Sequence, residues 1–404
     1  MTINPDTYIK NFKHTNPNLE FCAEEDVIEA LRFNVKREGI EIVSAFSTDM
    51  MPQKITMGNK PFILWDKGIS FLFGRYLALL AHRVEEGERY AYAKSSADLE
   101  SVLYLYLSNR FYREPLPSFL FAQMYAELGG MAPFNNRIAE KSVESRLKQA
   151  GFDIILKLGI IFVINHEFCH CLFEKDERRK AKGIRQTSDC LKSIIASKSW
   201  VDPSGDERKD YLPEYILESR DGMLQEELSC DVFAVINLTM ICMKIYGIEK
   251  ITAFVISCEA ANLLNQFLRQ LFACEEQLRL FNSFWKKRSS IQNVNEFIKE
   301  YSDPAERFKG FSERTKLACF IACMQLTQMG VLPFQFSPVG IPFVNTSKMA
   351  EEDINANLLK DINGLKYLIG FAARMGNYAD SNREVLGEND SELRLARNEL
   401  VGWI

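Results

Sequence analysis

The stretch His166-Glu167-Phe168-Cys169-His170 constrains this chain of 404 residues more than any other feature. It contains two of the four histidines in the whole chain. On a helix, residues four apart lie on one face, so both imidazoles can bind one metal ion. Glu167 would then lie beside them, within reach of a metal-bound water. The spacing therefore predicts a helix that carries a metal site of the zinc-hydrolase type.

The apolar segment before this motif predicts that the helix is buried. It runs from Phe152 to Asn165 without proline or a cluster of turn residues. Its length would suit a membrane span, but charged and polar residues interrupt it, so we expect no membrane insertion. Gly159 lies seven residues before His166 on the same face. It either lets another element approach closely or is simply a tolerated helix glycine.

A hydrolytic zinc ion usually takes three protein ligands and keeps one position for water, so a third ligand is needed. The best candidate is Glu227, which lies in a second helical pattern with Asp231 four residues later. Glu227 could bind the metal, and Asp231 could accept a hydrogen bond from the distal nitrogen of a ligand histidine. Glu226 has Cys230 at its i+4 position and lacks such a partner, although a shift of frame by one residue stays open.

The alternative is that these are ordinary core histidines and surface carboxylates. That interpretation would leave several buried polar groups on an apolar helix without partners, which is costly, so we prefer a metal site. Glu174 is also four residues from His170, but it is eight from His166, or about 12 Å along the helix axis. We therefore expect Glu174 to be a solvated residue at the helix end rather than a ligand.

At these residues the chain resembles the gluzincin metallopeptidases, in which H-E-x-x-H is followed tens of residues later by E-x-x-x-D on another helix. The resemblance covers two short segments. It implies a mostly α-helical α+β protein, with a zincin-like core and a helical lobe. It also implies a zinc peptidase with His166, His170 and Glu227 as ligands, Glu167 as general base and Asp231 supporting a ligand. Soluble intracellular members, including bacterial phage-exclusion peptidases, are closer in character than the membrane-embedded ones.

A group that stabilises the oxyanion is harder to find. Several gluzincins use a further histidine, a tyrosine or an arginine, and the segment 302–307 looks like their proline-arginine segment, with aspartate where histidine often stands. By this resemblance Arg307 or Arg314, seven apart and on similar faces, could supply the positive charge. Tyr301 is the other candidate. The alternative is that all three are solvated helix residues.

The ten cysteines are scattered, without the C-x-x-C pairs of structural zinc sites. Because the first 20 residues are polar and show no secretory signal, we expect reduced thiols and a cytoplasmic protein. Cys169, Cys171 and Cys230 fall close to the expected ligands. One of them could reach the open position of the zinc and hold the protein inactive, but small buried cysteines are commonplace.

Composition sets the outer bounds. A hydrophobic content of 47% predicts a large core, and a net charge of -5 argues against nucleic-acid binding. We expect N-terminal helices with a small sheet in 1–135, a catalytic helical core in 136–345 and a helical extension in 346–404. All three could form one compact unit. The oligomeric state is not specified.

Helical periodicity dominates the chain, and strands are a minority. Helices are predicted at 24–37, 70–86, 97–111, 251–287, 305–329 and 349–375, and strands at 40–46 and 61–65. The second strand is either an edge that receives an extended substrate or a core strand. Residues 198–213 are predicted to be a loop between the two motif helices.

These observations predict a cytoplasmic zinc-dependent endopeptidase that cleaves a specific protein target, with a regulatory or defence role. The intact Glu167 favours an enzyme, since a structural zinc site has no use for a general base. Two alternatives stay open. One is a catalytically silent, zinc-stabilised module that binds a protein, and the other is a hydrolase of non-peptide substrates.

Overall fold

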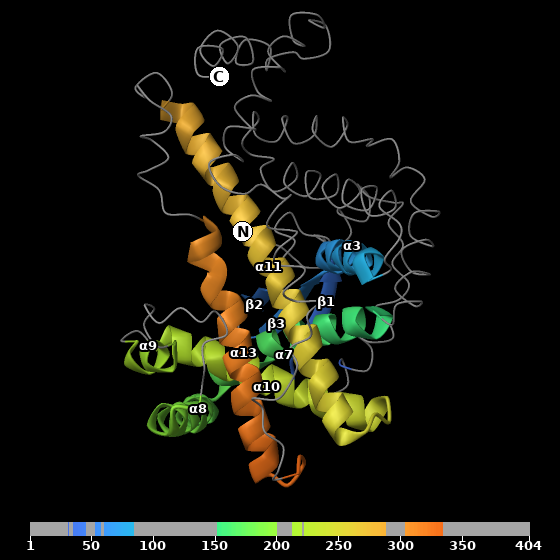
Figure 1. Ribbon diagram of the computed structural model, residues 1–404, viewed down its shortest axis with the longest axis vertical. Coiled ribbons are helices and arrows are strands. Elements are labelled where there is room, and N and C mark those ends of the chain that lie inside the picture. The colour runs from blue at the N-terminus through green and yellow to red at the C-terminus, as the bar shows by residue number, and fades with distance from the viewer. Residues whose placement is uncertain are drawn as a thin grey trace, which may run out of the picture. The chain divides into compact units, whose positions relative to one another are not determined.

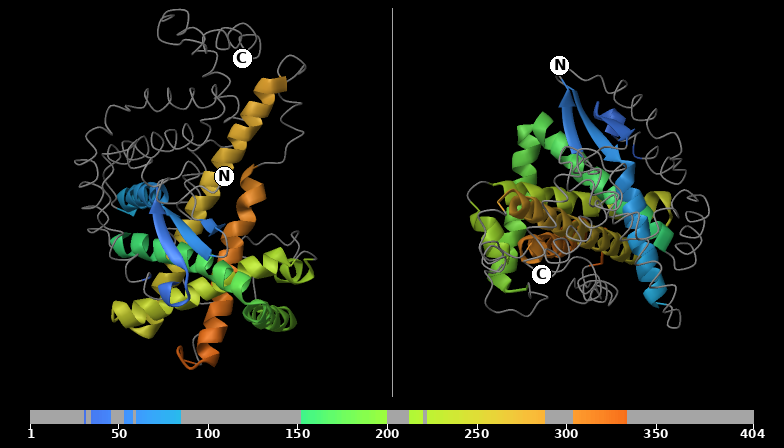
Figure 2. Two further views of the ribbon diagram at one scale, coloured as in Figure 1. Left: turned by 180° about the vertical axis from the view of Figure 1, so that it is seen from behind. Right: turned by 90° about the horizontal axis from the view of Figure 1, so that it is seen from above.

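The structure is a computed structural model in which residues 31, 35–45, 53–57, 60–84, 152–199, 212–219, 222–287 and 304–333 are described. The helices predicted at 97–111 and 349–375, and most of that at 24–37, lie outside these ranges. The described residues are mostly helical, with one small sheet (Figures 1 and 2). The mostly α-helical α+β class is therefore confirmed.

The chain divides into two compact units that do not follow its sequence order. The first comprises 1–73, 151–265 and 311–345, and the second comprises 74–150, 266–310 and 346–404. The two motif helices, the sheet and Arg314 all belong to the first unit. The three-part division expected from the sequence stays a prediction.

The sheet has three strands: β1 (Glu41–Ala45), β2 (Gln53–Met57) and β3 (Lys60–Asp66). Their order is β1-β3-β2, with β1 parallel and β2 antiparallel to β3. The predicted strands at 40–46 and 61–65 are confirmed as β1 and β3, whereas β2 was not predicted. The edge position proposed for 61–65 is wrong, because β3 is the central strand. Ile63, Leu64 and Trp65 are all buried, as a strand covered on both faces requires.

The motif lies on α7 (Phe152–Lys175), which packs against β2, β3 and α10 (Met223–Ile245). Asp153 in its first turn and Lys175 in its last turn complement the helix dipole. Most of the apolar residues that precede the motif are buried. The predicted buried helix is thus confirmed.

Gly159 is the point where α7 meets α3 (Lys67–Val84), the helix predicted at 70–86. A Cβ atom at Gly159 would lie 2.7 Å from Cε1 of Phe73, closer than real Cβ contacts allow. Of the two interpretations of this glycine, close approach is therefore the one confirmed. A similar contact joins α7 to α8 (Glu177–Ser197), where a Cβ at Gly183 would lie 2.8 Å from Cζ of Phe173.

Two further helices flank the N-terminal end of α10. Helix α8 was not predicted; it begins after Asp176, whose side chain accepts hydrogen bonds from the backbone N–H groups of Arg178 and Arg179. The short α9 (Leu212–Glu218) includes the last two residues of the loop predicted at 198–213, most of which lies outside the described residues. Gln225 donates from Nε2 to the carbonyl oxygens of Ile216 and Leu217 and so ties α9 to α10.

The remaining described helices are α11 (Lys250–Lys287) and α13 (Pro304–Gln328), which confirm the helices predicted at 251–287 and 305–329. By length and hydropathy, α10 and residues 250–268 of α11 could each cross a membrane. Buried core helices pass the same test, and 56% and 72% of the two apolar windows are buried within the protein. The same two helices could thus be membrane spans or buried core helices. The expectations of no membrane insertion and of a cytoplasmic location therefore stay predictions.

Candidate metal centre

His166 and His170 from α7 and Glu227 from α10 place three ligand atoms around one point. Nε2 of His166 lies 3.1 Å from Nε2 of His170. The carboxylate of Glu227 lies 3.5 Å from the first of these nitrogens and 3.2 Å from the second. This is the only cluster of three or more such ligand atoms among the residues that the structure describes.

These separations fit a tetrahedral zinc ion. With zinc-to-ligand bonds of roughly 2.0–2.1 Å, two ligands at the tetrahedral angle are about 3.3 Å apart. The two Nε2 atoms are 3.1 Å apart, and Glu227 approaches that of His166 to 3.5 Å with Oε2 and that of His170 to 3.2 Å with Oε1, all close to that value. A fourth position is left for water or substrate, as in catalytic zinc sites. The residue types and the spacing of their ligand atoms therefore suit zinc.

Behind His166 lies a buried ion-pair chain. Nδ1 of His166 lies 2.8 Å from Oδ1 of Asp231, an ion pair when the imidazole is protonated. Nε of Arg314, from α13, donates to Oδ2 of Asp231 at 2.7 Å, and Nη1 lies 3.5 Å from Glu227. The side chains of Asp231 and Arg314 are 2% and 12% exposed. We call these two residues the buried arm.

Behind His170 lies a second chain, which the sequence did not predict. Nδ1 of His170 is 3.2 Å from Oε1 of Glu226, and Nζ of Lys180, from α8, is 2.8 Å from Oε2 of the same carboxylate. The side chains of Glu226 and Lys180 are 24% and 33% exposed. We call these two residues the exposed arm. Glu226 thus contacts Nδ1 of His170, whereas Glu227 is the glutamate that joins the cluster of three ligand atoms.

The two arms assign the ring nitrogens. A carboxylate next to each Nδ1 favours a proton on that atom, so that each Nε2 would offer its lone pair to a metal ion at the common point. Metal-ligating histidines have this arrangement, with the second nitrogen held by a carboxylate. The predicted role of Asp231 beside a ligand histidine is therefore consistent with the geometry.

The site carries an excess of negative charge. Burial opposes a charged imidazole, but Asp231 and Glu227 raise the pKa of His166 well above its usual range. Burial likewise opposes the charge on His170, yet Cys230 and Glu227 raise the pKa of His170 to about 10. Burial disfavours ionisation of Glu227, but both histidines lower its pKa far below the usual range. In the metal-free protein these contacts therefore favour protonated imidazoles beside an ionised Glu227.

Glu167 points toward the sheet. Its Oε2 accepts a hydrogen bond of 3.0 Å from the backbone N–H of Lys54 in β2. About two turns further along α7, Glu174 pairs with Nζ of Lys54 at 2.9 Å and is 3.4 Å from the hydroxyl of Thr56. Glu174 is 45% exposed and lies at the helix end, as predicted, but it also ties α7 to β2. The predicted general base is thus anchored next to a strand.

The three oxyanion candidates have different outcomes. Arg314 lies in the site, but it is buried and pairs with the carboxylates behind the ligands. Arg307 lies on α13, and its side chain is outside the described residues, as is the whole of Tyr301. The interpretation of Arg314 as a solvated helix residue is therefore wrong, while the oxyanion role stays a prediction for all three.

The cysteines near the ligands are buried. Cys169, Cys171 and Cys230 are each 0% exposed, and Cys169 and Cys230 pack with Phe173 in one cluster. Burial raises the pKa of Cys171 to about 12 and that of Cys230 far above its usual range. Because a metal-binding sulfur is a thiolate, these values favour the interpretation as small buried cysteines.

No protein-family model, curated protein or solved structure matches the chain. The resemblance to gluzincins consequently depends on the motif residues and their geometry alone. What the structure establishes is a His166, His170 and Glu227 cluster that could hold a metal ion, inside a mostly helical α+β protein.

Proposed function

We propose that this protein is a zinc-dependent endopeptidase with a zincin-like core. The observation that carries the proposal is the convergence of His166, His170 and Glu227 at tetrahedral ligand spacing, with Glu167 in the same helical turn. The three ligands would hold the zinc. When bound, zinc lowers the pKa of its water toward neutrality and polarises a carbonyl group.

Glu167 would act as the general base. It would accept a proton from the attacking water and then transfer that proton to the leaving amine. The N–H of Lys54 occupies one oxygen of Glu167, and Oε1 has no hydrogen-bond partner among the described residues. This arrangement fixes the carboxylate while leaving one oxygen free for proton transfer.

A peptide substrate is supported by the position of β2. It is an outer strand, and at Lys54 its backbone faces Glu167 rather than β3. No described strand pairs with this outer side. An extended peptide that adds to such an edge forms backbone hydrogen bonds and passes next to the general base. The predicted docking edge therefore moves from β3 to β2 in this proposal.

The test is a comparison of wild type with Glu167→Gln. Both zinc-loaded proteins would be incubated with β-casein and with a cell extract, and new peptide N-termini would be identified by terminal-amine labelling and mass spectrometry. We expect fragments with wild type only, and equal zinc content in both proteins. Chelation should abolish cleavage, and added zinc should restore it. Identical fragments from both proteins would overturn the role of Glu167.

The hydrogen bond from Lys54 to Glu167 also favours the alternative, a catalytically silent zinc-stabilised module that binds a protein, because it gives Glu167 a structural use. That alternative predicts zinc-dependent stability without any fragments. A hydrolase of non-peptide substrates predicts Glu167-dependent cleavage of small esters or amides with no new protein termini. A specific protein target, a regulatory or defence role and a cytoplasmic location belong to the proposal as predictions.

A further inference from the structure

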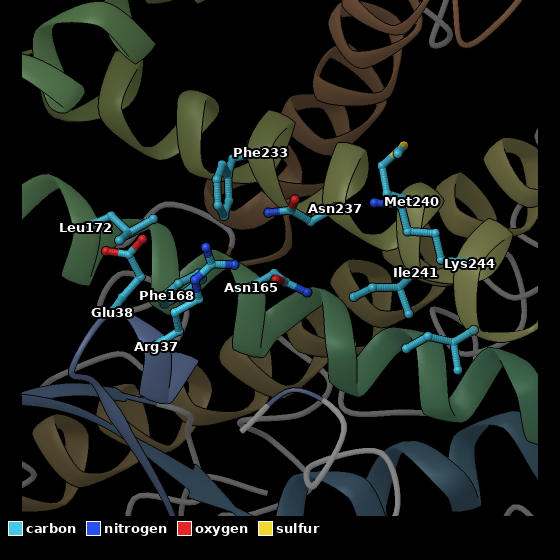
Figure 3. Close-up of a pocket in the computed structure, with 11 residues that line it drawn as sticks. Arg37, Glu38, Asn165, Phe168, Leu172, Phe233, Asn237, Met240, Ile241 and Lys244 are labelled. Atoms are coloured by element: carbon cyan, nitrogen blue, oxygen red, sulfur yellow. The ribbon is translucent and has the colours of Figure 1, made fainter. Parts of the chain in front are cut away.

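A pocket of about 560 Å³ lies between α7 and α10, away from the metal ligands (Figure 3). Residues from one stripe of α7 form one wall, and residues from one stripe of α10 form the other. Its volume is within the range of sites for small ligands. The lining residues all belong to the first compact unit: Arg37, Glu38, Asn165, Phe168, Leu172, Phe233, Asn237, Met240, Ile241, Lys244 and Ile245.

The inner part of the pocket is apolar. Phe168 and Leu172 are 8% and 9% exposed, and the ring of Phe168 lies 6.2 Å from that of Phe233 across the two helices. Two amides interrupt this surface, one from each helix. Asn165 is buried and donates from Nδ2 to the carbonyl of Ile161 at 2.9 Å, and its Oδ1 has no hydrogen-bond partner among the described residues. The interior suits a hydrocarbon group with few polar atoms.

The rim of the pocket is positively charged. Arg37 and Lys244 are exposed and have no ion-pair partner among the described residues. In Figure 3 their side chains extend toward the space between α7 and α10. The acidic residue on the same rim, Glu38, is already paired with Arg179 at 3.4 Å. Two cations are therefore left for a ligand at the mouth of an apolar pocket.

We propose that this pocket binds an amphipathic carboxylate, with its apolar part against the paired rings of Phe168 and Phe233 and its carboxylate near Arg37 and Lys244. An apolar body buries surface in such a pocket, and a carboxylate gains charge-assisted hydrogen bonds at the rim. The same chemistry is offered by a free medium-chain fatty acid and by the C-terminal residue of a peptide. The inference does not depend on the proposed peptidase activity.

The site is separate from the metal centre but shares two helices with it. Asn165 and Phe168 alternate with His166 and Glu167 along α7, and they line the pocket. On α10, Phe233 also packs against the buried cluster of Cys169, Phe173 and Cys230. A carboxylate that bound the zinc instead would not contact these pocket residues. Variants of the pocket can therefore distinguish the two binding modes.

The test uses the full-length Glu167→Gln protein, so that no probe is cleaved and the result does not depend on catalysis. Octanoate and 1-octanol would be titrated by calorimetry, as would a short peptide ending in leucine, as the free acid and as the amide. We expect octanoate or the peptide acid to bind about tenfold tighter than its uncharged counterpart, which corresponds to one charge-assisted contact. The preferred pair identifies the source of the carboxylate.

Three variants locate the binding. Arg37→Gln and Lys244→Gln should each weaken carboxylate binding severalfold, and Asn237→Trp should abolish it by filling the pocket. Lys182→Gln is the matched control and should have no effect, because Lys182 is an exposed lysine on α8 and does not line the pocket. Equal binding of acid and uncharged counterpart, or unchanged binding in Asn237→Trp, would overturn the proposal.

Discussion

The buried arm and the exposed arm perform the same task in different surroundings. In each, a carboxylate faces Nδ1 of a ligand histidine and a cation holds that carboxylate. Asp231 and Arg314 are 2% and 12% exposed, whereas Glu226 and Lys180 are 24% and 33% exposed. The two histidines of one motif are consequently oriented by charges that differ mainly in their access to water.

This difference determines what each arm contributes. Charges away from water interact more strongly and are little screened by salt, but a charge that loses its partner there is costly. A solvated pair gains little and can lose one member without a large penalty. We therefore expect the buried arm to govern folding and zinc affinity together, and the exposed arm to adjust zinc affinity alone.

The largest expected effect is on stability. Arg314→Met should lower the free energy of unfolding of the metal-free protein by about 3 kcal/mol or more, because the buried carboxylate of Asp231 loses its guanidinium partner and keeps only His166. Urea denaturation followed by circular dichroism measures this loss. Lys180→Met is the matched control and should change the same free energy by less than about 1 kcal/mol. Similar losses in both variants would refute the distinction between the arms.

A second expected difference concerns zinc affinity. Asp231→Asn should weaken zinc binding by about 100-fold and Glu226→Gln by about tenfold, the two ends of the range for residues that orient ligand histidines. The buried carboxylate should have the larger effect because solvent cannot replace it. Competition with a chromogenic chelator, on protein shown to be folded, gives both values. A larger loss of zinc affinity in Glu226→Gln than in Asp231→Asn would contradict the proposed difference between the two arms.

The metal-free protein should also lose stability as the pH rises. The pKa of His170 is raised to about 10, from an unfolded value of about 6.5. The contribution of protonated His170 to the free energy of unfolding is therefore fully present below pH 6.5 and is lost as the pH rises toward 10. Zinc takes the place of the proton, so the zinc-loaded protein should show no such decline. Thermal unfolding between pH 6 and 10 checks this, with His170→Gln as the variant expected to lose much of the slope.

Local spacing explains which parts of the site were predictable from the sequence. His166, Glu167 and His170 lie within two turns of one helix, and Glu227 and Asp231 lie within two turns of another, so periodicity placed each group correctly. Arg314 was selected for a different role, by resemblance. The cation of the exposed arm was not selected at all, since Lys180 lies in a mixed-charge run that is typical of a solvated surface.

The sheet shows the same limit. The strands at 40–46 and 61–65 were found from their apolar runs, but β2 was not, because Gln53-Lys54-Ile55-Thr56-Met57 is short and half polar. β1 is also an outer strand, but it has more apolar residues than β2 and was found. The order of strands is a tertiary property, and without β2 the sequence could not decide whether 61–65 is an edge or a core strand.

The smallest expected effect tests whether the exposed arm acts through solvent-screened charge. Glu226 pairs with Lys180 at 2.8 Å, and both side chains reach water, so removing the cation should weaken zinc binding only about threefold at low salt. At 1 M salt the screening length falls to about 3 Å, and wild type and Lys180→Met should then bind zinc equally. A salt-independent difference would mean that Lys180 acts by packing α8 against α10 rather than by its charge. In that case the two arms would differ in kind as well as in exposure.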